Sequence, residues 1–247
     1  MDWDWSVFWR YLVDPRMADA AVITLGVATL AQALATIVGF VVALGLRSRA
    51  RAGRLLAGFY IWLFRGTPPL VQLLLFYFGL PELGIRLTVF EAGISALSLY
   101  GAAYMAEIIR AGLESIDRGQ AEAARSLGFS RALTMRSVLL PQALRVILPP
   151  FGNEFTGMMR TTSLLSVISF EELLRVTTLA INETFQPIEL YSVAALYYLA
   201  MTTGWMYVQR VLENRLTPGR TRPRTPGGRP PTSLQEIGQV SSDAALP

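Results

Sequence analysis

Five long apolar segments alternate with polar ones along the chain, and each approaches the length of a bilayer-spanning helix, about 20 residues. They lie at about 20–46, 55–80, 92–109, 151–170 and 190–211. Every backbone polar group of a spanning segment must be satisfied within the membrane, which favours helices. The pattern therefore predicts an all-α, polytopic membrane protein with five transmembrane helices.

Proline interrupts the second apolar segment. Residues 65–69 read Arg-Gly-Thr-Pro-Pro, and two consecutive prolines remove two backbone donors. We expect a kink or break there. The span proper would then be about 67–80, with 55–65 nearer the membrane surface. Pro149 and Pro150 are expected to break the chain in the same way before the fourth span.

Charge is distributed unevenly between the two sets of polar segments. One set holds 16 Arg and four acidic residues, and the other holds four Arg and ten acidic residues. The first set comprises 47–54, 110–145 and 210–229, and the second comprises 1–19, 81–91 and 171–189. Because cytoplasmic loops carry the basic excess, the N-terminus is predicted outside and the C-terminus in the cytoplasm.

The two ends of the chain differ from its middle. Residues 1–19 combine Trp and Tyr with acidic residues, which is typical of a segment at the membrane–water interface. Residues 217–247 are rich in Pro, Gly and Arg and are expected to form a disordered cytoplasmic tail. The predicted transmembrane domain is 20–216.

Composition narrows the possible functions. Hydrophobic residues make up 52% and charged residues 16%, against roughly 25% charged in soluble domains. All 22 basic residues are Arg, and the chain has no Lys, His or Cys. A nucleotide-hydrolysing P-loop needs its Lys, and Ser–His triads, His or Cys metal sites and Schiff bases lack their required atoms. We therefore expect no catalytic residue, no metal site and no cofactor, with energy supplied by a partner.

The polar loop 118–141 is predicted to form two short helices. Residues 120–127 favour a helix, Gly128 suits the left-handed position after its end, and Ser130 can cap a second helix that Pro141 ends. Small apolar side chains would offer a face to a partner: Ala123, Ala124, Leu127 and Phe129. On these residues alone, a solvated loop without a partner is an equal alternative.

The loop resembles the EAA motif of binding-protein-dependent ABC importer permeases. The resemblance rests on Glu122-Ala123-Ala124, on Gly128 and on Val138-x-Leu140-Pro141. Further matches to the polar amino-acid branch of that family occur in the family's order over about 20–215. They are 65–72, 78–81, 106–110, 119–120, 140–145, 149–150, 152–155 and 162–164. Pro69 and Arg160 depart from it, since Leu and Lys are more usual there.

The resemblance implies a type I ABC importer (MetI-like) transmembrane fold in the bacterial inner membrane. A second permease subunit, identical or different, would pair with this one, and a dimer of separate ABC ATPase subunits would dock on the two loops. An extracytoplasmic amino-acid-binding protein would deliver the substrate, and no nucleic acid is involved. The residues implied in ATPase coupling are Glu122, Ala123, Ala124, Leu127 and Gly128.

Polar residues of the fourth span are candidates for the substrate pathway, because such residues are costly at membrane depth. They are Asn153, Glu154, Arg160, Thr162 and Ser163. Glu154 and Arg160 lie about 120° apart around a helix and should not pair. They are therefore available to meet the ammonium and the carboxylate of an amino acid separately. The alternative is a structural role, with hydrogen bonds across helices.

For four further residues, a structural role is favoured over contact with the substrate. Arg65 is expected to snorkel or contact a helix end, and Glu107 to pair with an Arg of the loop. Tyr100 and Tyr104 share one helical face, where core packing is favoured over a place in the pathway.

Other functions are weighed against the importer. A permease for another small polar solute would keep the same architecture. A passive channel would not need a docking loop, and an intramembrane enzyme would normally need Asp or His, which the predicted spans lack. The sequence leaves open which amino acid is moved.

Overall fold

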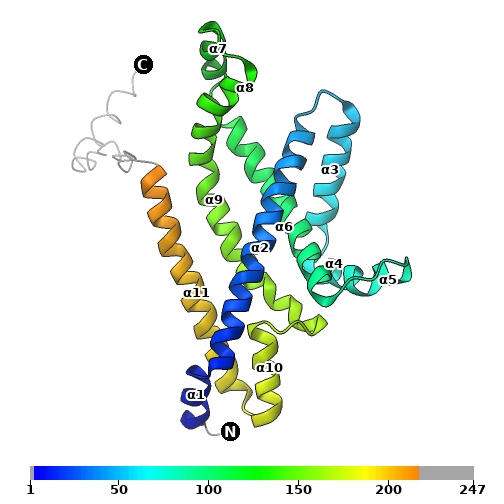
Figure 1. Ribbon diagram of the computed structural model, residues 1–247, viewed down its shortest axis with the longest axis vertical. Coiled ribbons are helices and arrows are strands. Elements are labelled where there is room, and N and C mark those ends of the chain that lie inside the picture. Colours follow the sequence, from blue (N-terminus) through cyan, green and yellow to red (C-terminus); the bar gives the residue numbers. More distant parts are fainter. Residues whose placement is uncertain (1–2, 217–247) are drawn as a thin grey trace, which may run out of the picture.

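The computed structural model describes residues 3–216, and all regular structure in that range is helical (Figure 1). The helices are α1 (Trp5–Leu12), α2 (Pro15–Leu46), α3 (Arg51–Gly66), α4 (Pro69–Leu74), α5 (Leu80–Glu82), α6 (Val89–Glu114), α7 (Arg118–Ser126), α8 (Arg131–Thr134), α9 (Leu140–Thr161), α10 (Leu173–Thr184) and α11 (Pro187–Leu216). Two π-helical turns, η1 (Leu75–Gly79) and η2 (Met135–Leu139), and one 3₁₀ turn, η3 (Thr162–Ile168), join some of them. The predicted tail at 217–247 lies outside the described residues.

The centre of the bundle is the contact between α2 and α6, where small residues let the backbones approach. A Cβ added to Gly39 would come within 2.6 Å of the Met105 Cβ and 2.9 Å of the Ala102 carbonyl oxygen. Gly101 is similarly enclosed, whereas a Cβ on Gly26 would meet no atom within 4 Å. Close approach through small residues is how helices associate in lipid, where the hydrophobic effect is weak.

The predicted break at the prolines is confirmed. Helix α3 and the segment 69–82 meet at an angle of 105°. The amide of Gln72 holds this bend, because its Nε2 donates to the carbonyl oxygens of Phe64 (2.9 Å) and Thr67 (3.1 Å) at the end of α3. Helix α3 itself lies beside α2 and α6 (Figure 1), and the segment 69–82 packs on α6 as well, with Leu73 buried in the core.

The prediction that Pro141 ends a helix was wrong. Segments α8, η2 and α9 follow one another without interruption. In the π-helical turn before the proline, the Leu140 N–H bonds to the Met135 carbonyl, five residues back. The wider turn shifts the hydrogen-bond ladder just where Pro141 has no N–H to offer, and Pro141 itself occupies the first turn of α9, a position that tolerates proline.

The expected break at Pro149 and Pro150 was also wrong, since both lie inside α9. Side chains of α11 cover this stretch: Gln209 Nε2 donates to the Pro149 carbonyl (3.3 Å), and Trp205 Nε1 donates to the Gly152 carbonyl (2.9 Å). Neighbouring helices commonly support proline-containing helices in membranes in this way. The sequence pattern held no sign of this contact.

The predicted outer loop 171–189 contains a helix, α10. Its N-cap, Glu172, is fully buried and accepts from the Arg175 N–H (2.8 Å) and from the Tyr198 hydroxyl of α11 (2.9 Å). The neighbouring Leu173 N–H donates to Thr24 of α2 (3.1 Å). Burial raises the pKa of Glu172 above its usual value, and the hydrogen bonds that its carboxylate accepts oppose the rise. This junction joins α2, α10 and α11 at one end of the bundle.

Two of the described helices, α2 and α6, are long and apolar enough to cross a membrane, and the bent pair of α3 with 69–82 makes a possible third. The fourth and fifth predicted spans fall within α9–η3 and α11, which are more polar. The Arg-containing turn after α2, the segment around α7 and α8, and the end of α11 lie toward the same end of the bundle (Figure 1). Helices α1 and α10 lie at the opposite end.

Candidate functional site

The polar loop folds into a compact knuckle, which we define as residues 117–134 (Figure 1). The Asp117 carboxylate caps α7 by accepting from the Gly119 N–H (2.7 Å). At the other end, the Phe129 N–H donates to the Ala124 carbonyl (3.1 Å) and the Gly128 N–H to that of Arg125 (2.9 Å). These paired bonds form a Schellman motif. Gly128 has φ +82°, which confirms the predicted left-handed residue.

The knuckle is tied to the helix that follows it. Ser130 accepts from the Leu133 N–H (3.2 Å), which confirms the predicted cap. Gln142 of α9 donates from Nε2 to the Gln120 side-chain oxygen (3.3 Å) and to the Val138 carbonyl (2.9 Å). Helices α7 and α9 are therefore linked by a side-chain contact as well as through the backbone.

The surface of the knuckle is polar with two exposed large apolar residues, Leu127 and Leu133. Glu122 and Ala123 are exposed, and the Leu127 side chain is 78% exposed. Ala124, by contrast, is 4% exposed and packs inside the knuckle. The apolar part available to a partner is thus Ala123, Leu127 and Leu133, and Ala124 is buried beneath.

A cluster of polar side chains lies on one face of α6. Glu107 pairs with Arg110 one turn on (2.9 Å) and, more loosely, with Arg65 at the end of α3 (3.9 Å). The Arg65 guanidinium stands over the Tyr104 ring at 5.2 Å, and the hydroxyl groups of Tyr100 and Tyr104 are 3.3 Å apart. The expected pairing of Glu107 with an arginine of the loop 118–141 was wrong, because its partners are Arg110 of α6 and Arg65 of α3, which lie closer to it.

Glu154 and Arg160 of α9 occupy different surroundings. Glu154 is half-buried, with Arg65 and Tyr100 as its electrostatic neighbours. Arg160 is exposed, and its Nε donates weakly to the Thr156 carbonyl (3.4 Å). Among residues 3–216 neither forms an ion pair, with the other or elsewhere, which agrees with the expected separation around the helix.

The predicted substrate residues do not gather in one place. Arg160 and Ser163 line a shallow hollow of about 290 Å³ beside Pro69. Thr162 is fully buried, and its hydroxyl donates to the Met159 carbonyl (2.8 Å). Asn153 is exposed and lies outside the hollow. The arrangement offers a cationic group in the hollow and, separately, the carboxylate of Glu154 next to the α6 cluster.

Sequence reasoning missed three buried polar residues. Gln72 was read as part of a motif, yet it holds the bend between α3 and α4. Glu172 was counted as a loop acid, yet it caps α10 inside the fold. Gln32 of α2 is buried, and its amide has no partner within the described range. A lone Gln in an uncharged apolar run is the signal that could have drawn attention to Gln32.

A helical bundle with apolar crossing helices, a polar face on α6 and an exposed knuckle at its Arg-rich end defines a membrane transport subunit. The chain belongs to the family of binding-protein-dependent transport system inner membrane components, whose model matches residues 35–218. It is accordingly a transport component and not an enzyme.

Curated relatives of this chain are named as transport permeases for amino acids and related compounds. The arginine transport system permease protein ArgU of Corynebacterium glutamicum is 35% identical, covering 90% of this chain and 74% of that protein. The octopine transport system permease protein OccM of Rhizobium meliloti is 37% identical, covering 83% of this chain and 87% of that protein.

Solved structures show the same fold. A chain from the crystal structure of an amino acid ABC transporter with histidines is 40% identical and superposes with a TM-score of 0.80, covering 87% of this chain and all of that one. A chain of the MetNI methionine ABC transporter, 16% identical, superposes with a TM-score of 0.68 and covers 81% of this chain and 96% of that one. The fold is therefore the MetI-like type I importer fold.

Proposed function

We propose that this chain is the membrane-spanning permease subunit of an ATP-driven importer that moves polar amino acids across the bacterial inner membrane by alternating access. The observation that carries the proposal is the knuckle, an exposed element that continues through η2 into the helix that bears Glu154 and Arg160. Relatives that carry arginine and octopine in their names support a polar amino acid as cargo.

The topology belongs to this proposal. We place five crossings in α2, the bent pair of α3 with 69–82, α6, α9 with η3, and α11. The N-terminus is outside and the C-terminus cytoplasmic, because the Arg-rich turns share one end of the bundle (Figure 1) and basic residues favour the cytoplasmic side.

The knuckle would receive the ATPase. Glu122, Ala123 and Leu127 are exposed for contact, and Gly128 sets the turn that presents them. A dimer of separate ATPase subunits would hold two such knuckles, one from this chain and one from a second permease subunit, identical or different. An extracytoplasmic amino-acid-binding protein would deliver the substrate to the opposite end.

Two groups of α9 would meet the substrate. Arg160, with Ser163 in the same hollow, suits the carboxylate of an amino acid, since a guanidinium binds carboxylates with directed hydrogen bonds. Glu154 suits the ammonium or a basic side chain. Thr162, whose hydroxyl is committed to the Met159 carbonyl, would hold the start of η3 in place, and Asn153 would lie along the path.

The test is uptake of labelled amino acids into vesicles that contain this chain, its ATPase and its binding protein. Leu127→Ala removes the exposed apolar contact and should abolish ATP-driven uptake and ATPase co-purification without loss of membrane insertion. Leu83→Ala is the matched control, because Leu83 is 76% exposed but lies in the turn before α6, away from the knuckle. Uptake that persists without ATP would instead support a passive channel.

A further inference from the structure

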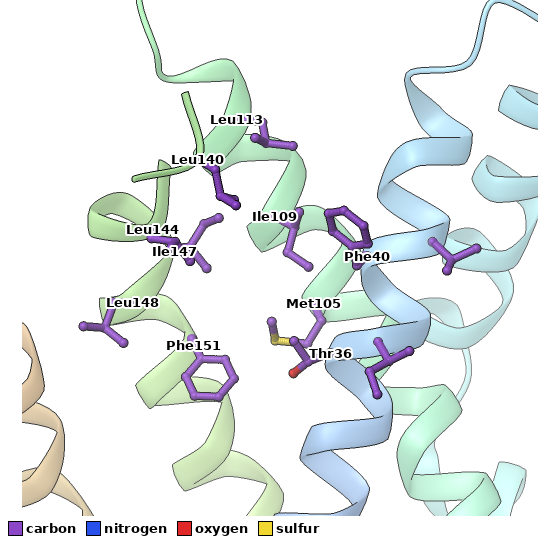
Figure 2. Close-up of a pocket in the computed structure, with 12 residues that line it drawn as sticks. Thr36, Phe40, Met105, Ile109, Leu113, Leu140, Leu144, Ile147, Leu148 and Phe151 are labelled. Atoms are coloured by element: carbon purple, nitrogen blue, oxygen red, sulfur yellow. The ribbon is translucent and has the colours of Figure 1, made fainter. Parts of the chain in front are cut away.

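An apolar groove of about 540 Å³ lies between α2, α6 and α9 (Figure 2). Phe40 of α2 and Phe151 and Ile147 of α9 face one another across it, with Met105 and Ile109 of α6 behind. The hydroxyl of Thr36, at the wall of the groove, donates to the Gln32 carbonyl (2.7 Å) and so points its hydrogen into the helix. The groove therefore suits a hydrocarbon and not an amino acid.

The groove faces away from the polar cluster. On α6 its lining residues follow a four-residue spacing at Met105, Ile109 and Leu113. At about 100° per residue, Tyr104 and Glu107 lie on roughly the opposite side of the same helix. An aqueous path along the polar cluster and a hydrocarbon chain in this groove would thus lie on opposite sides of α6.

The rim of the groove is open and apolar. Ile37, Phe40 and Val41 of α2 and Leu144 of α9 are all large hydrophobic residues exposed in this chain. A patch of this kind marks a site of protein or lipid contact. Its position on the side away from the polar cluster favours lipid.

One end of the groove carries unpaired positive charge. The groove reaches Leu113 and Leu140, next to the Arg-rich knuckle. Arg136, four residues before Leu140, is exposed and forms no ion pair with residues 3–216. Basic groups beside a crevice between membrane helices attract anionic lipid headgroups on the cytoplasmic side.

We propose that the groove binds one acyl chain of an anionic phospholipid of the cytoplasmic leaflet, whose headgroup pairs with Arg136. The assignment to the cytoplasmic leaflet rests on the orientation proposed above. The test measures lipid binding and does not depend on transport. The acyl chain would fill the space between the α2–α6 pair and α9. It would thereby set the distance of α9 from α2 and α6.

The test measures lipid retained by the purified chain, by native mass spectrometry after extraction from vesicles of equal phosphatidylglycerol and phosphatidylcholine. The unaltered chain should retain phosphatidylglycerol in preference. Leu144→Trp fills the rim of the groove and should lose most of the bound lipid, as should Val41→Trp from the opposite wall. Leu199→Trp is the control, since Leu199 is an exposed leucine of α11 outside the groove, and should retain it.

The headgroup is tested separately. Arg136→Gln should lower the preference for phosphatidylglycerol about fivefold, the equivalent of about 1 kcal/mol for one arginine, while lipid stays bound. Equal retention by Leu144→Trp and the unaltered chain, or no preference for the anionic lipid in the unaltered chain, would overturn the proposal.

A second copy of the chain is the rival occupant. Because the sequence has no Cys, Ile37→Cys introduces a single thiol at the rim. Efficient disulfide formation between copies in native membranes would assign the groove to a subunit interface and refute the lipid site. Absence of such a cross-link, with lipid retained, is the expected result.

Discussion

Gly128→Val tests whether the knuckle must be rigid to couple ATP hydrolysis to transport. Gly128 has φ +82°, where a residue with a Cβ costs about 1–2 kcal/mol. Escape from that conformation would break the two Schellman bonds, from the Phe129 and Gly128 N–H groups, at about 1 kcal/mol each. Both chains lose these bonds when the turn opens, so only the strain of about 1–2 kcal/mol distinguishes the variant. It lowers the ratio of formed to unformed turn by a factor of about 5 to 30.

The assay compares ATP-driven uptake, ATPase co-purification and membrane insertion for each variant. Gly128→Val should lose uptake and ATPase association and keep normal insertion, because the strain is confined to an exposed turn. Gly128→Asn should keep most activity, since Asn tolerates the left-handed region. Gly58→Val is the matched control: Gly58 lies inside α3, and an added Cβ meets no atom within 4 Å.

The reasoning fails if Gly128→Val transports like the unaltered chain and still retains its ATPase. It also fails if Gly128→Asn is as inactive as Gly128→Val, because the defect would then follow from loss of glycine and not from backbone conformation.

Three further predictions concern the bundle. Glu154→Gln should weaken uptake of basic amino acids more than of neutral ones; identical kinetics across both classes would make Glu154 structural. Gly39→Val should lower the free energy of unfolding by at least 1–3 kcal/mol, because its side chain would overlap Met105 and the Ala102 backbone, and a melting curve that matches the unaltered chain would contradict the packing. Glu172→Gln should flatten the pH dependence of Tm above about pH 4.5: burial raises the pKa of Glu172, so its stabilising contribution is present below the ordinary pKa of 4.5 and is lost as the pH rises through the raised pKa. An unchanged slope of Tm against pH would show that Glu172 does not titrate in this range.

Sequence patterns predicted the local structure correctly where the chemistry of the backbone and its nearest side chains determines it. The bend at Pro68 and Pro69 follows from two missing donors, and the left-handed turn at Gly128 follows from the freedom of glycine. The cap at Ser130 follows in the same way from a hydroxyl next to free N–H groups. Each of these features needs no contact from a distant part of the chain.

Predictions failed where another helix decides the outcome. Pro149 and Pro150 stay within α9, in a stretch where Trp205 and Gln209 of α11 donate to its carbonyl groups. Ala124 was expected on the surface, and it lies inside because α7 folds back on the start of the next helix. The candidate substrate residues share a sequence segment, but their direction around α9 separates them, and that direction depends on how the bundle packs.

The uninterrupted run of helix from Arg131 to Thr161 has a mechanical consequence. At 1.5 Å per residue it is about 45 Å long, with the turn that follows α7 at one end and Arg160 at the other. A tilt of about 5° about one end would move the far end by about 4 Å, comparable to the width of a side chain. Force applied to α7 would thus pass through the turn at 127–130 and then along one continuous helix to the guanidinium.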